Sequence, residues 1–411
     1  MCSICGGTRF DTSALAVFDA AKDRGRDYSN IFYRGGSWIC NHRAIPTTEV
    51  ETAEFNQPFG TDYKIVHNGT ISNDKELGNP EGMIDSYVLS RVLDFSSIDK
   101  LVESLQKIKG SYAIAAMKPN GHFFLACNYK PLFYTVANRA LYFSSYEHHL
   151  KAAAGSSAIM RVPPYSVLDT ETMEAREIPR EESNRAVVVC SGGLDSTAVA
   201  AYACHTHGPA NVTLLHFQYG CIAETKELQC VRKIAEYLGC DHYVMPIDYK
   251  FSNGASKLFG DRDEISPGIA GAEYAHEWVP ARNLIMLSLA VGYAEANGFG
   301  YIYLGTNLEE AGAYPDNEEQ FIRDFNACLY GAVQNGKHVQ IRTPVGNLMK
   351  HEIVLFGLKY NAPFHLTWSC YKDGELPCGR CGPCYMRRTA FARNGLTDPL
   401  EYPDKEISGE D

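Results

Sequence analysis

The first 180 residues or so alternate short runs of apolar residues with turn-forming residues. Such runs are rich in β-branched and aromatic side chains, which is typical of strands, and long helical patterns are few. Examples are "NIFYRGGSWICNHRAI", "YKIVHNGTI" and "SYAIAAM". This half of the chain is therefore predicted to be mainly β-structure. A charged stretch, "ETMEAREIPREESNR", then leads to Ala186, and we interpret it as a linker.

From Ala186 onward the pattern changes, because strand-like and helix-like segments now alternate. "AVVVC" has the composition of a buried strand, and "TAVAAYACHTHG" that of a helix ended by Gly208. The segments that follow are "NVTLLHF", "ETKELQCVRKIAEYLG", "HYVMPI", "RNLIMLSLAVGYAEANG" and "YIYLG". Strands that alternate with helices predict a doubly wound parallel α/β sheet.

The length of the chain agrees with two domains. At 411 residues it exceeds one ordinary domain, and 45% hydrophobic with 21% charged residues suffice for a normal core in each. We find no run of eighteen apolar residues and no signal-peptide pattern, so we expect a cytoplasmic protein without a membrane span. The 14 cysteines are then expected to be reduced thiols or metal ligands rather than a disulfide framework.

The net charge of −11 narrows the choice of partners. Affinity for nucleic acid rests on clustered Lys and Arg, so an acidic chain favours a small-molecule substrate. A local basic patch is compatible with this balance, and nucleic acid is disfavoured rather than excluded.

A glycine-rich junction follows the first strand of the second half and opens its first helix. The backbone N–H groups of such a loop and the helix N-terminus can cradle a phosphate, although an ordinary strand–helix turn is the alternative. The junction resembles the S-G-G-x-D-S loop of the PP-loop ATP pyrophosphatases. That resemblance implies a Rossmann-like fold, ATP with Mg²⁺, and adenylation of a substrate oxygen. The implied nucleotide-binding residues are Ser191, Gly192, Gly193, Leu194, Asp195 and Ser196.

Four cysteines lie close together in "SCYKDGELPCGRCGPC", namely Cys370, Cys378, Cys381 and Cys384. Their C-x₇-C-x₂-C-x₂-C spacing suits a closed tetrahedral Zn²⁺ site with a structural role. "CGPC" also occurs in thioredoxin active sites, but there it follows the first strand of a domain and has no two further thiols upstream. An iron–sulfur cluster stays open from the ligand type alone.

Residues 186–395 resemble the QueC family, the 7-cyano-7-deazaguanine synthases, which join the same loop to a C-terminal four-cysteine zinc site. Further matches are "WVPARN", "YIYLGTN" before "AYPD", and "TWSCY". In one departure from the family, Cys221, Ile222 and Ala223 replace the usual Gln-Arg-His, which leaves the acceptor open.

Three polar residues in these matches are candidates for contacts with the nucleotide or the acceptor. The resemblance implies that Arg282 holds a phosphate or a carboxylate, and that Asp316 contacts the deazaguanine edge or Mg²⁺. Asn283, the residue after Arg282, is the third candidate. As alternatives, Arg282 and Asn283 merely begin a helix, and Asp316 shapes a Tyr-Pro-Asp turn.

The first half resembles the class II glutamine amidotransferases, which are N-terminal-nucleophile (Ntn) hydrolases with an αββα sandwich. The markers are "NHRAI", "NQP", "HNGTISN", an Asp-Ser pair and "GSYA". They imply that Cys2 attacks the glutamine amide once Met1 is removed, with its own α-amine as base. They also imply an oxyanion hole of Asn68 and Gly69. The implied glutamine-binding residues are Arg43, His67 and Asp85.

Together the two halves predict a glutaminase domain over 2–180 and a QueC-like synthetase domain over 186–400. We expect a ligase in which glutamine supplies ammonia and ATP activates the 7-carboxy or 7-amido group of a 7-deazaguanine. The product is a 7-amido-, 7-cyano- or 7-formamidino-7-deazaguanine of queuosine or archaeosine biosynthesis. Such a fusion resembles the Gat-QueC proteins, which implies an acceptor in tRNA or DNA as an alternative to the free base.

Two rival functions and one structural question stay open. Asparagine synthetase has the same domain order but lacks the four-cysteine array. A non-enzymatic binding protein would require both sites to have decayed, which the intact candidate residues disfavour. A homodimer is compatible with the sequence.

Overall fold

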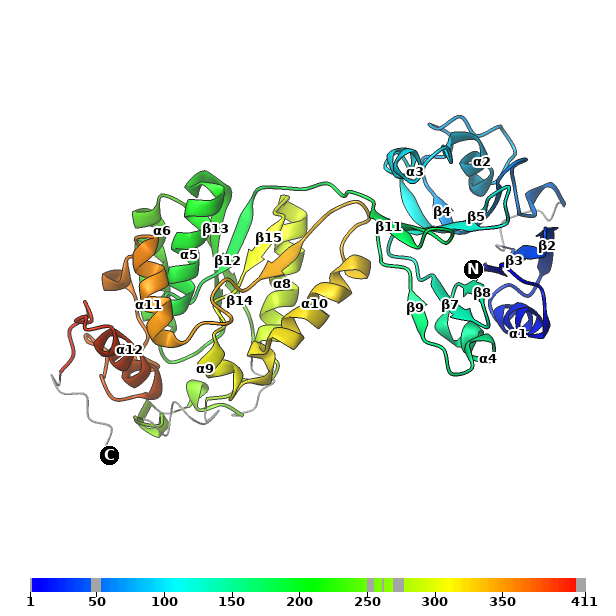
Figure 1. Ribbon diagram of the computed structural model, residues 1–411. Helices are drawn as coiled ribbons and strands as arrows, with labels where there is room; N and C mark the ends of the chain where they lie inside the picture. The colour runs from blue at the N-terminus through cyan, green and yellow to red at the C-terminus, as the bar shows by residue number, and fades with distance from the viewer. Residues whose placement is uncertain (1, 46–52, 250–254, 261, 269–276, 404–411) are drawn as a thin grey trace. The chain divides into compact units, whose positions relative to one another are not determined.

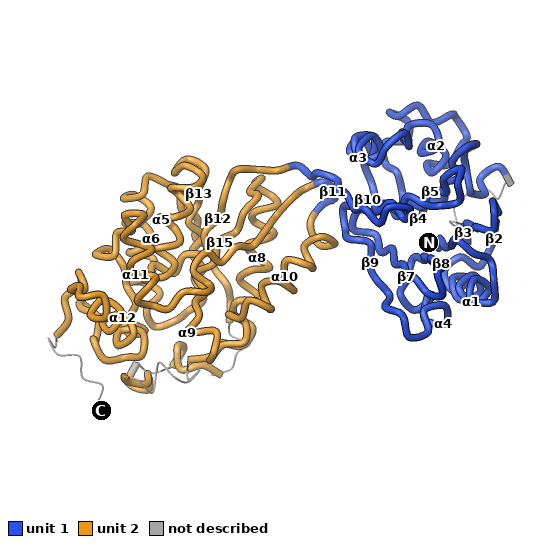
Figure 2. The backbone as a smooth tube through the Cα atoms, viewed as in Figure 1, with its two compact units in different colours: residues 1–181, 334–336 blue, residues 182–333, 337–411 orange. Residues whose placement is uncertain are grey.

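The computed structural model describes residues 2–45, 53–249, 255–260, 262–268 and 277–403 (Figure 1). It contains two compact units (Figure 2). Unit 1 comprises residues 1–181 and 334–336, and unit 2 comprises residues 182–333 and 337–411. No helix among the described residues is long and apolar enough to cross a bilayer.

Unit 1 contains two antiparallel sheets. The first has the strand order β2 (Tyr28–Arg34), β3 (Ser37–Arg43), β1 (Ser3–Gly7), β8 (Ala140–Ser144), β7 (Phe133–Ala137) and β9 (Ile159–Arg161). The second has the order β11 (Glu174–Glu177), β10 (Ser166–Asp169), β6 (Phe123–Cys127), β5 (Gly110–Met117) and β4 (Lys64–Ile71). The helices of this unit are α1 (Thr12–Ala21), α2 (Leu89–Val92), α3 (Ile98–Leu105) and α4 (Lys151–Ala154).

The two sheets of unit 1 face each other across one apolar core. Ile4 and Ile39 of the first sheet pack there with Val66 and Leu125 of the second. Helix α1 covers the other face of the first sheet, and α3 packs against β10 and β11 of the second. A strand that is buried on both faces does not alternate between apolar and polar residues, which explains the nearly continuous apolar sequences of these strands. This arrangement confirms the predicted αββα sandwich.

One sequence interpretation was wrong in part: the boundary between the units, after Glu181, falls within the predicted linker, but the same stretch also contains a strand. The charged stretch before Ala186, predicted to be a linker, contains the edge strand β11, which pairs with β10 from Ser166↔Glu177 to Asp169↔Glu174. Three of the four β11 residues are charged and three are exposed, so the strand lacks the apolar alternation by which strands are recognised. Charged residues on an edge strand also discourage pairing with other chains.

Unit 2 is built on a five-stranded sheet in which every pair is parallel. Its strand order is β14 (Asp241–Pro246), β13 (Val212–Gln218), β12 (Ala186–Val189), β15 (Tyr301–Tyr303) and β16 (Gln340–Arg342). The helices are α5 (Leu194–His207), α6 (Glu224–Leu238), α8 (Arg282–Asn297), α9 (Leu308–Ala311), α10 (Glu319–Ala332), α11 (Lys350–Lys359) and α12 (Gly382–Arg393).

Helices cover both faces of this sheet. One core joins the sheet to α5, α6 and α11, and a second core joins it to α8 and α10 (Figure 1). The predicted doubly wound parallel sheet is therefore confirmed. In such a sheet the loops at the carboxyl ends of the strands form the ligand crevice, which is where the polar residues of unit 2 gather.

Candidate active sites

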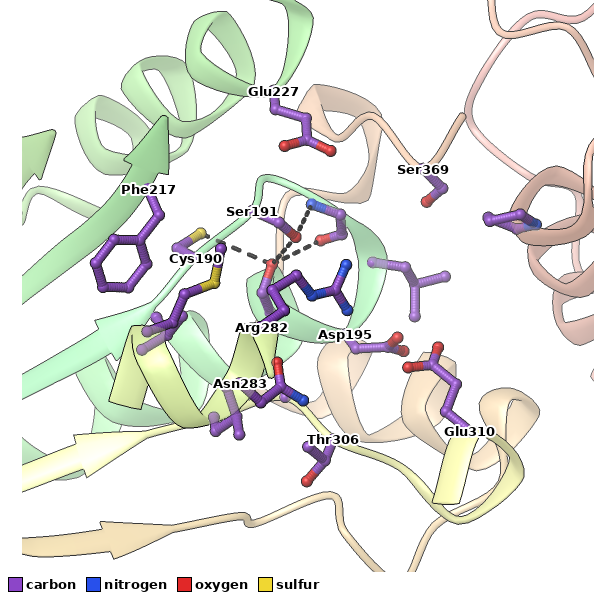
Figure 3. Close-up of a pocket in the computed structure, with 18 of the residues that line it drawn as sticks. Cys190, Ser191, Asp195, Phe217, Glu227, Arg282, Asn283, Thr306, Glu310 and Ser369 are labelled. Atoms are coloured by element: carbon purple, nitrogen blue, oxygen red, sulfur yellow. Dashed lines mark hydrogen bonds between the residues drawn. The ribbon is translucent and has the colours of Figure 1, made fainter. Parts of the chain in front are cut away.

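The predicted phosphate loop joins β12 to α5 at the carboxyl end of the sheet. Ser196 Oγ lies 3.2 Å from Ser191 Oγ and 3.4 Å from the Gly193 carbonyl oxygen (Figure 3). Gly192 has φ +79°, and a Cβ there would lie 2.9 Å from the Glu227 carbonyl oxygen, so the position requires glycine. The loop therefore presents backbone N–H groups at the start of a fourteen-residue helix, which is a favourable anion site.

A cavity of about 210 Å³ lies beside this loop (Figure 3). Of the residues predicted to bind the nucleotide or the acceptor, Gly192 and Asp316 do not line this cavity. Those that do are Ser191, Gly193, Leu194, Asp195, Ser196, Arg282 and Asn283. Aromatic side chains from the C-terminal segment, Trp368 and Tyr371, complete part of the wall. Apolar walls with a few convergent polar groups are typical of small-molecule sites.

Three charged side chains form an ion triad in this cavity. Lys350 Nζ donates to Asp195 Oδ2 at 2.5 Å and to Glu310 Oε1 at 2.9 Å, and only 9% of the lysine side chain is exposed. Burial raises the pKa of Asp195 to about 6, against the opposing effect of Lys350. Burial opposes ionisation of the lysine, yet the two carboxylates raise its pKa, so it stays protonated. Asp195 Oδ1 is buried without a partner among the described residues, which fits a further cation such as Mg²⁺.

Arg282 and Asn283 begin α8, as the structural alternative expected. The Asn283 backbone N–H donates to Asp316 Oδ2 at 3.2 Å, and its side-chain amide donates to Asn317 Oδ1 at 2.7 Å. Asp316 thus caps the helix, which supports its structural role. Arg282 instead lines the cavity, and although burial acts against ionisation, tyrosines and acidic groups nearby raise the pKa of its guanidinium.

Glu227, on α6, is a further acidic group of the cavity wall. Burial raises its pKa to about 7, against the opposing effect of Arg282. Its Oε2 lies 4.0 Å from Cys221 Sγ. Cys221 and Ala223, the residues that depart from the family pattern, are themselves buried in an apolar cluster and do not line the cavity.

The motifs did not include Glu227, Glu310 or Lys350. Glu310 lies between the matches "YIYLGTN" and "AYPD", so its position there was a usable signal. Lys350 begins α11 and is separated from Asp195 by 155 residues, and nothing in its local sequence indicates this contact.

The four predicted cysteine ligands come together at the start of α12. One ligand atom from each of Cys370, Cys378, Cys381 and Cys384 lies within 4.8 Å of all the others. The backbone N–H groups of Lys372 and Cys378 donate to Cys370 Sγ at 3.3 and 3.4 Å. Such N–H···S bonds stabilise thiolates, so the cluster fits a metal ion that prefers sulfur ligands.

Two of the predicted glutaminase residues, Cys2 and Arg43, lie at the ends of paired strands in unit 1. Ser3 pairs with His42, so the next position along each strand brings Cys2 and Arg43 to the same edge of the first sheet. Arg43 is buried, and its Nη1 donates to Asn56 Oδ1 at 3.5 Å. The predicted removal of Met1 concerns a residue outside the described ones.

Strand β4 carries the predicted oxyanion residues, Asn68 and Gly69. Gly69 has φ +159°, and a Cβ there would lie 1.9 Å from the Ser111 carbonyl oxygen, so no other residue fits. His67, before them, is engaged at both ring nitrogens, by Ser86 Oγ at 2.8 Å and the Ser111 carbonyl at 3.2 Å. Burial lowers the pKa of this imidazole. These contacts hold the imidazole in place next to Asn68, and the predicted binding of glutamine by His67 stays a prediction.

Asp85 starts a short 3₁₀ helix, Asp85–Val88, beside β4. Its Oδ2 accepts from the Ile71 backbone N–H at 2.6 Å, and its Oδ1 accepts from the Ser86 backbone N–H at 2.7 Å. Neutral backbone donors thus fix the carboxylate without cancelling its charge, which leaves it suited to a cationic ligand group.

These two units correspond to two known families. Residues 42–152 match the family described as glutamine amidotransferase domain, and residues 185–395 match the one described as queuosine biosynthesis protein QueC. The fold and these two matches therefore define a glutamine-dependent carbon–nitrogen ligase with a glutamine amidotransferase domain of the Ntn type. The chain belongs to the QueC family.

Similar proteins include several named 7-cyano-7-deazaguanine synthase. The one from Sulfolobus acidocaldarius is 45% identical over 389 residues, 89% of this chain and 83% of that protein. The one from Saccharolobus solfataricus is 44% identical over 391 residues, 89% and 84% of the two chains. The one from Methanothrix thermoacetophila is 39% identical over 224 residues, 53% of this chain and 98% of that protein. A solved structure of glutamine phosphoribosylpyrophosphate amidotransferase from B. subtilis aligns at 14% identity with a TM-score of 0.37, too low to carry an argument.

Proposed function

We propose that unit 1 hydrolyses glutamine to supply ammonia, and that unit 2 uses ATP to activate the 7-carboxy group of a 7-deazaguanine for that ammonia. The observation that carries this proposal is the cavity of unit 2. It combines a glycine-rich loop at a helix N-terminus with Asp195, Lys350 and Arg282, in a QueC-family chain. This set suits phosphate and carboxylate groups of a nucleotide and an acceptor.

In unit 1 the thiol of Cys2 would attack the amide carbon of glutamine. The α-amine freed by removal of Met1 would take the thiol proton, because a terminal amine has a pKa of about 8. Arg43 would bind the α-carboxylate and Asp85 the ammonium group, while Asn68 and the Gly69 N–H donate to the oxyanion. The result is a thioester and one ammonia, and water then releases glutamate.

In unit 2 the residues would hold ATP so that its α-phosphate faces the acceptor oxygen. The N–H groups of residues 191–196 would bind the departing pyrophosphate, and Arg282 would neutralise the acceptor carboxylate or the α-phosphate. Mg²⁺ bound with ATP supplies charge neutralisation on the phosphates, and Asp195 is the residue that would hold it. Ammonia then displaces AMP from the adenylated carboxylate and gives the amide.

Further reaction of the amide decides the product. A second adenylation gives an imidate, which either eliminates AMP to form the nitrile or exchanges AMP for ammonia to form the amidine. We propose the 7-cyano compound, because relatives that match both units are named 7-cyano-7-deazaguanine synthase. The amidine is the second candidate, because a built-in glutaminase raises the local ammonia concentration. The net charge of −11 favours a free base as acceptor over tRNA or DNA.

For the metal, we propose that Cys370, Cys378, Cys381 and Cys384 bind a structural Zn²⁺. Four convergent thiols with N–H···S bonds and no open position support this choice over a catalytic ion. An iron–sulfur cluster would be recognised by its visible absorption and by iron in metal analysis.

The function is tested by mass spectrometry after incubation with ATP, Mg²⁺, glutamine and 7-carboxy- or 7-cyano-7-deazaguanine. The proposal predicts AMP, pyrophosphate and the 7-cyano base from the 7-carboxy base. An amidine from the 7-cyano substrate, free or in nucleic acid, would support the second candidate instead. Formation of asparagine from aspartate, or ATP left uncleaved with every acceptor, would contradict the proposal.

A further inference from the structure

A second group of metal-ligating side chains lies inside unit 1, away from the four-cysteine cluster. Cys5 of β1 pairs directly with Cys40 of β3, and His42 follows Cys40 by two residues on the same strand. Residues two apart on a strand point to the same face. One ligand atom from each of the three side chains lies within 4.8 Å of both others.

The spacing of these atoms suits two ligands of one ion. Cys40 Sγ lies 3.7 Å from His42 Nε2. With bonds of about 2.3 Å to sulfur and 2.1 Å to nitrogen, and an angle of about 109–120°, ligand atoms lie roughly 3.6–3.8 Å apart. In the four-cysteine cluster, the Sγ atoms of Cys370 and Cys381 are separated by a similar 3.9 Å.

The imidazole is also oriented as a metal ligand requires. His42 Nδ1 lies 2.7 Å from Ser29 Oγ on the neighbouring strand β2. A metal-binding histidine normally has its second nitrogen held in this way, which fixes the ring and directs the lone pair of the other nitrogen to the ion. Phe18 of α1 packs against the ring with centroids 4.7 Å apart.

The surroundings exclude water. Cys5, Cys40 and His42 are each 0% exposed, and the two thiols belong to the apolar core beneath α1, with Val17 and Trp38. Two thiolates and a neutral imidazole carry two negative charges, which Zn²⁺ cancels and Cu⁺ reduces to one, so either ion lowers the charge that the apolar core must hold. Thiolate-rich sets of this kind favour Zn²⁺ or Cu⁺ over harder ions.

We propose that Cys5, Cys40 and His42 form a second site for a thiophilic cation, Zn²⁺ or Cu⁺, which fastens β1 to β3. Loading replaces the two thiol protons, which are released to solvent. The consequence for catalysis rests on the proposed function: β1 begins next to Cys2, and β3 ends at Arg43, so the ion would hold the nucleophile and the glutamine-binding arginine in register.

The test is the metal content of the full-length chain, purified without oxygen and without chelators. Inductively coupled plasma mass spectrometry should find two equivalents of zinc plus copper per chain. Cys40→Ser and Cys5→Ser should each retain one equivalent, while Cys204→Ser, a matched change of a buried cysteine in neither cluster, should retain two. Because the readout is a metal count, it does not depend on turnover, and failure of the proposed function would leave it unchanged.

A measurement on the unaltered protein tests the proposal even if the cysteine variants do not fold. Zinc and copper K-edge absorption should show a mixed sulfur and nitrogen shell in addition to the all-sulfur shell of the four-cysteine cluster. One equivalent per chain with an all-sulfur shell, after exposure to both ions, would overturn the proposal. A Cys5–Cys40 disulfide in the oxygen-free protein, detected by alkylation and peptide mass, would overturn it as well.

Discussion

The two candidate active sites hold their polar groups in opposite ways. In unit 2 the key groups are charged and pair with one another, since Lys350 lies between Asp195 and Glu310. In unit 1 the corresponding groups are held by neutral hydrogen bonds, as when two backbone N–H groups fix Asp85. The difference matches the proposed ligands. A nucleotide carries negative charges that the protein must neutralise, whereas the amide group of glutamine is uncharged and must be positioned by hydrogen bonds. It follows that changes of charge should affect unit 2 most, and changes of shape should affect unit 1 most.

The largest expected effect comes from loss of the metal ion proposed for the four-cysteine cluster. Cys381→Ser should lower the free energy of unfolding of unit 2 by roughly 5 kcal/mol or more, because binding of a structural Zn²⁺ is coupled to folding. Thermal denaturation, with loss of one zinc by metal analysis, measures this. The matched change Cys328→Ser alters an exposed cysteine outside the cluster and should leave the stability unchanged. Equal stability of both variants would show that the cluster is not a structural metal site.

A neutral residue at position 350 should disturb the charge balance of unit 2. Lys350→Met leaves Asp195 and Glu310 buried together without their cation, which should cost about 3–5 kcal/mol of stability. AMP formation should fall by at least about 10³-fold with glutamine and with ammonium alike. Lys359→Met, an exposed change on the same helix, is the control. Loss with glutamine only would place Lys350 outside the ATP-dependent step.

A change of shape should instead disable unit 1. Gly69→Ala pushes a methyl group against the Ser111 carbonyl and displaces the proposed oxyanion N–H. Glutamine hydrolysis should fall by about 10²–10³-fold, the usual cost of a lost oxyanion donor. Glutamate release measures this, and ammonium-supported synthesis should persist. Gly78→Ala has positive φ but open space around the added carbon, so it separates steric displacement from backbone strain. Equal effects of both changes would remove Gly69 from the oxyanion hole.

The smallest effect concerns Glu227 and depends on pH. The pKa of this carboxyl, raised by burial to about 7, exceeds the value of 4.5 for a free glutamate. Its contribution to stability is therefore complete below about pH 4.5 and is lost as the pH rises through about 7. Glu227→Gln should be more stable than the unaltered protein by about 1–3 kcal/mol above pH 7 and equal to it near pH 4.5. Urea unfolding at both pH values measures this.

The control for this change is Glu236→Gln, an exposed substitution on the same helix. It should show no pH-dependent gain in stability. A gain for Glu227→Gln that is independent of pH would mean that burial does not raise the pKa of the carboxyl.

Sequence patterns predicted the features whose residues are close together in the chain, and they missed contacts between residues that are far apart in the chain. The parallel sheet follows from periodicity, and the four-cysteine cluster follows from a motif whose members lie within sixteen residues of one another, whereas the sandwich was implied by the resemblance to class II glutamine amidotransferases. The contact of Lys350 with Asp195 joins residues 155 positions apart, so only the packing of α11 against α5 brings them together. His67 illustrates a different limit: its motif indicated a functional residue, but its two ring contacts, with Ser86 and Ser111, could not be read from the sequence.

The proposed function divides the reaction between the units, with ammonia made in unit 1 and used in unit 2. The most direct test compares product formation by Cys2→Ala with glutamine and with a high concentration of ammonium, on protein whose removal of Met1 has been established by intact mass. Glutamine-supported synthesis should fall by about 10³-fold or more, and ammonium-supported synthesis should stay within about twofold of the unaltered protein. Equal loss with both nitrogen sources would contradict the division of labour between the units.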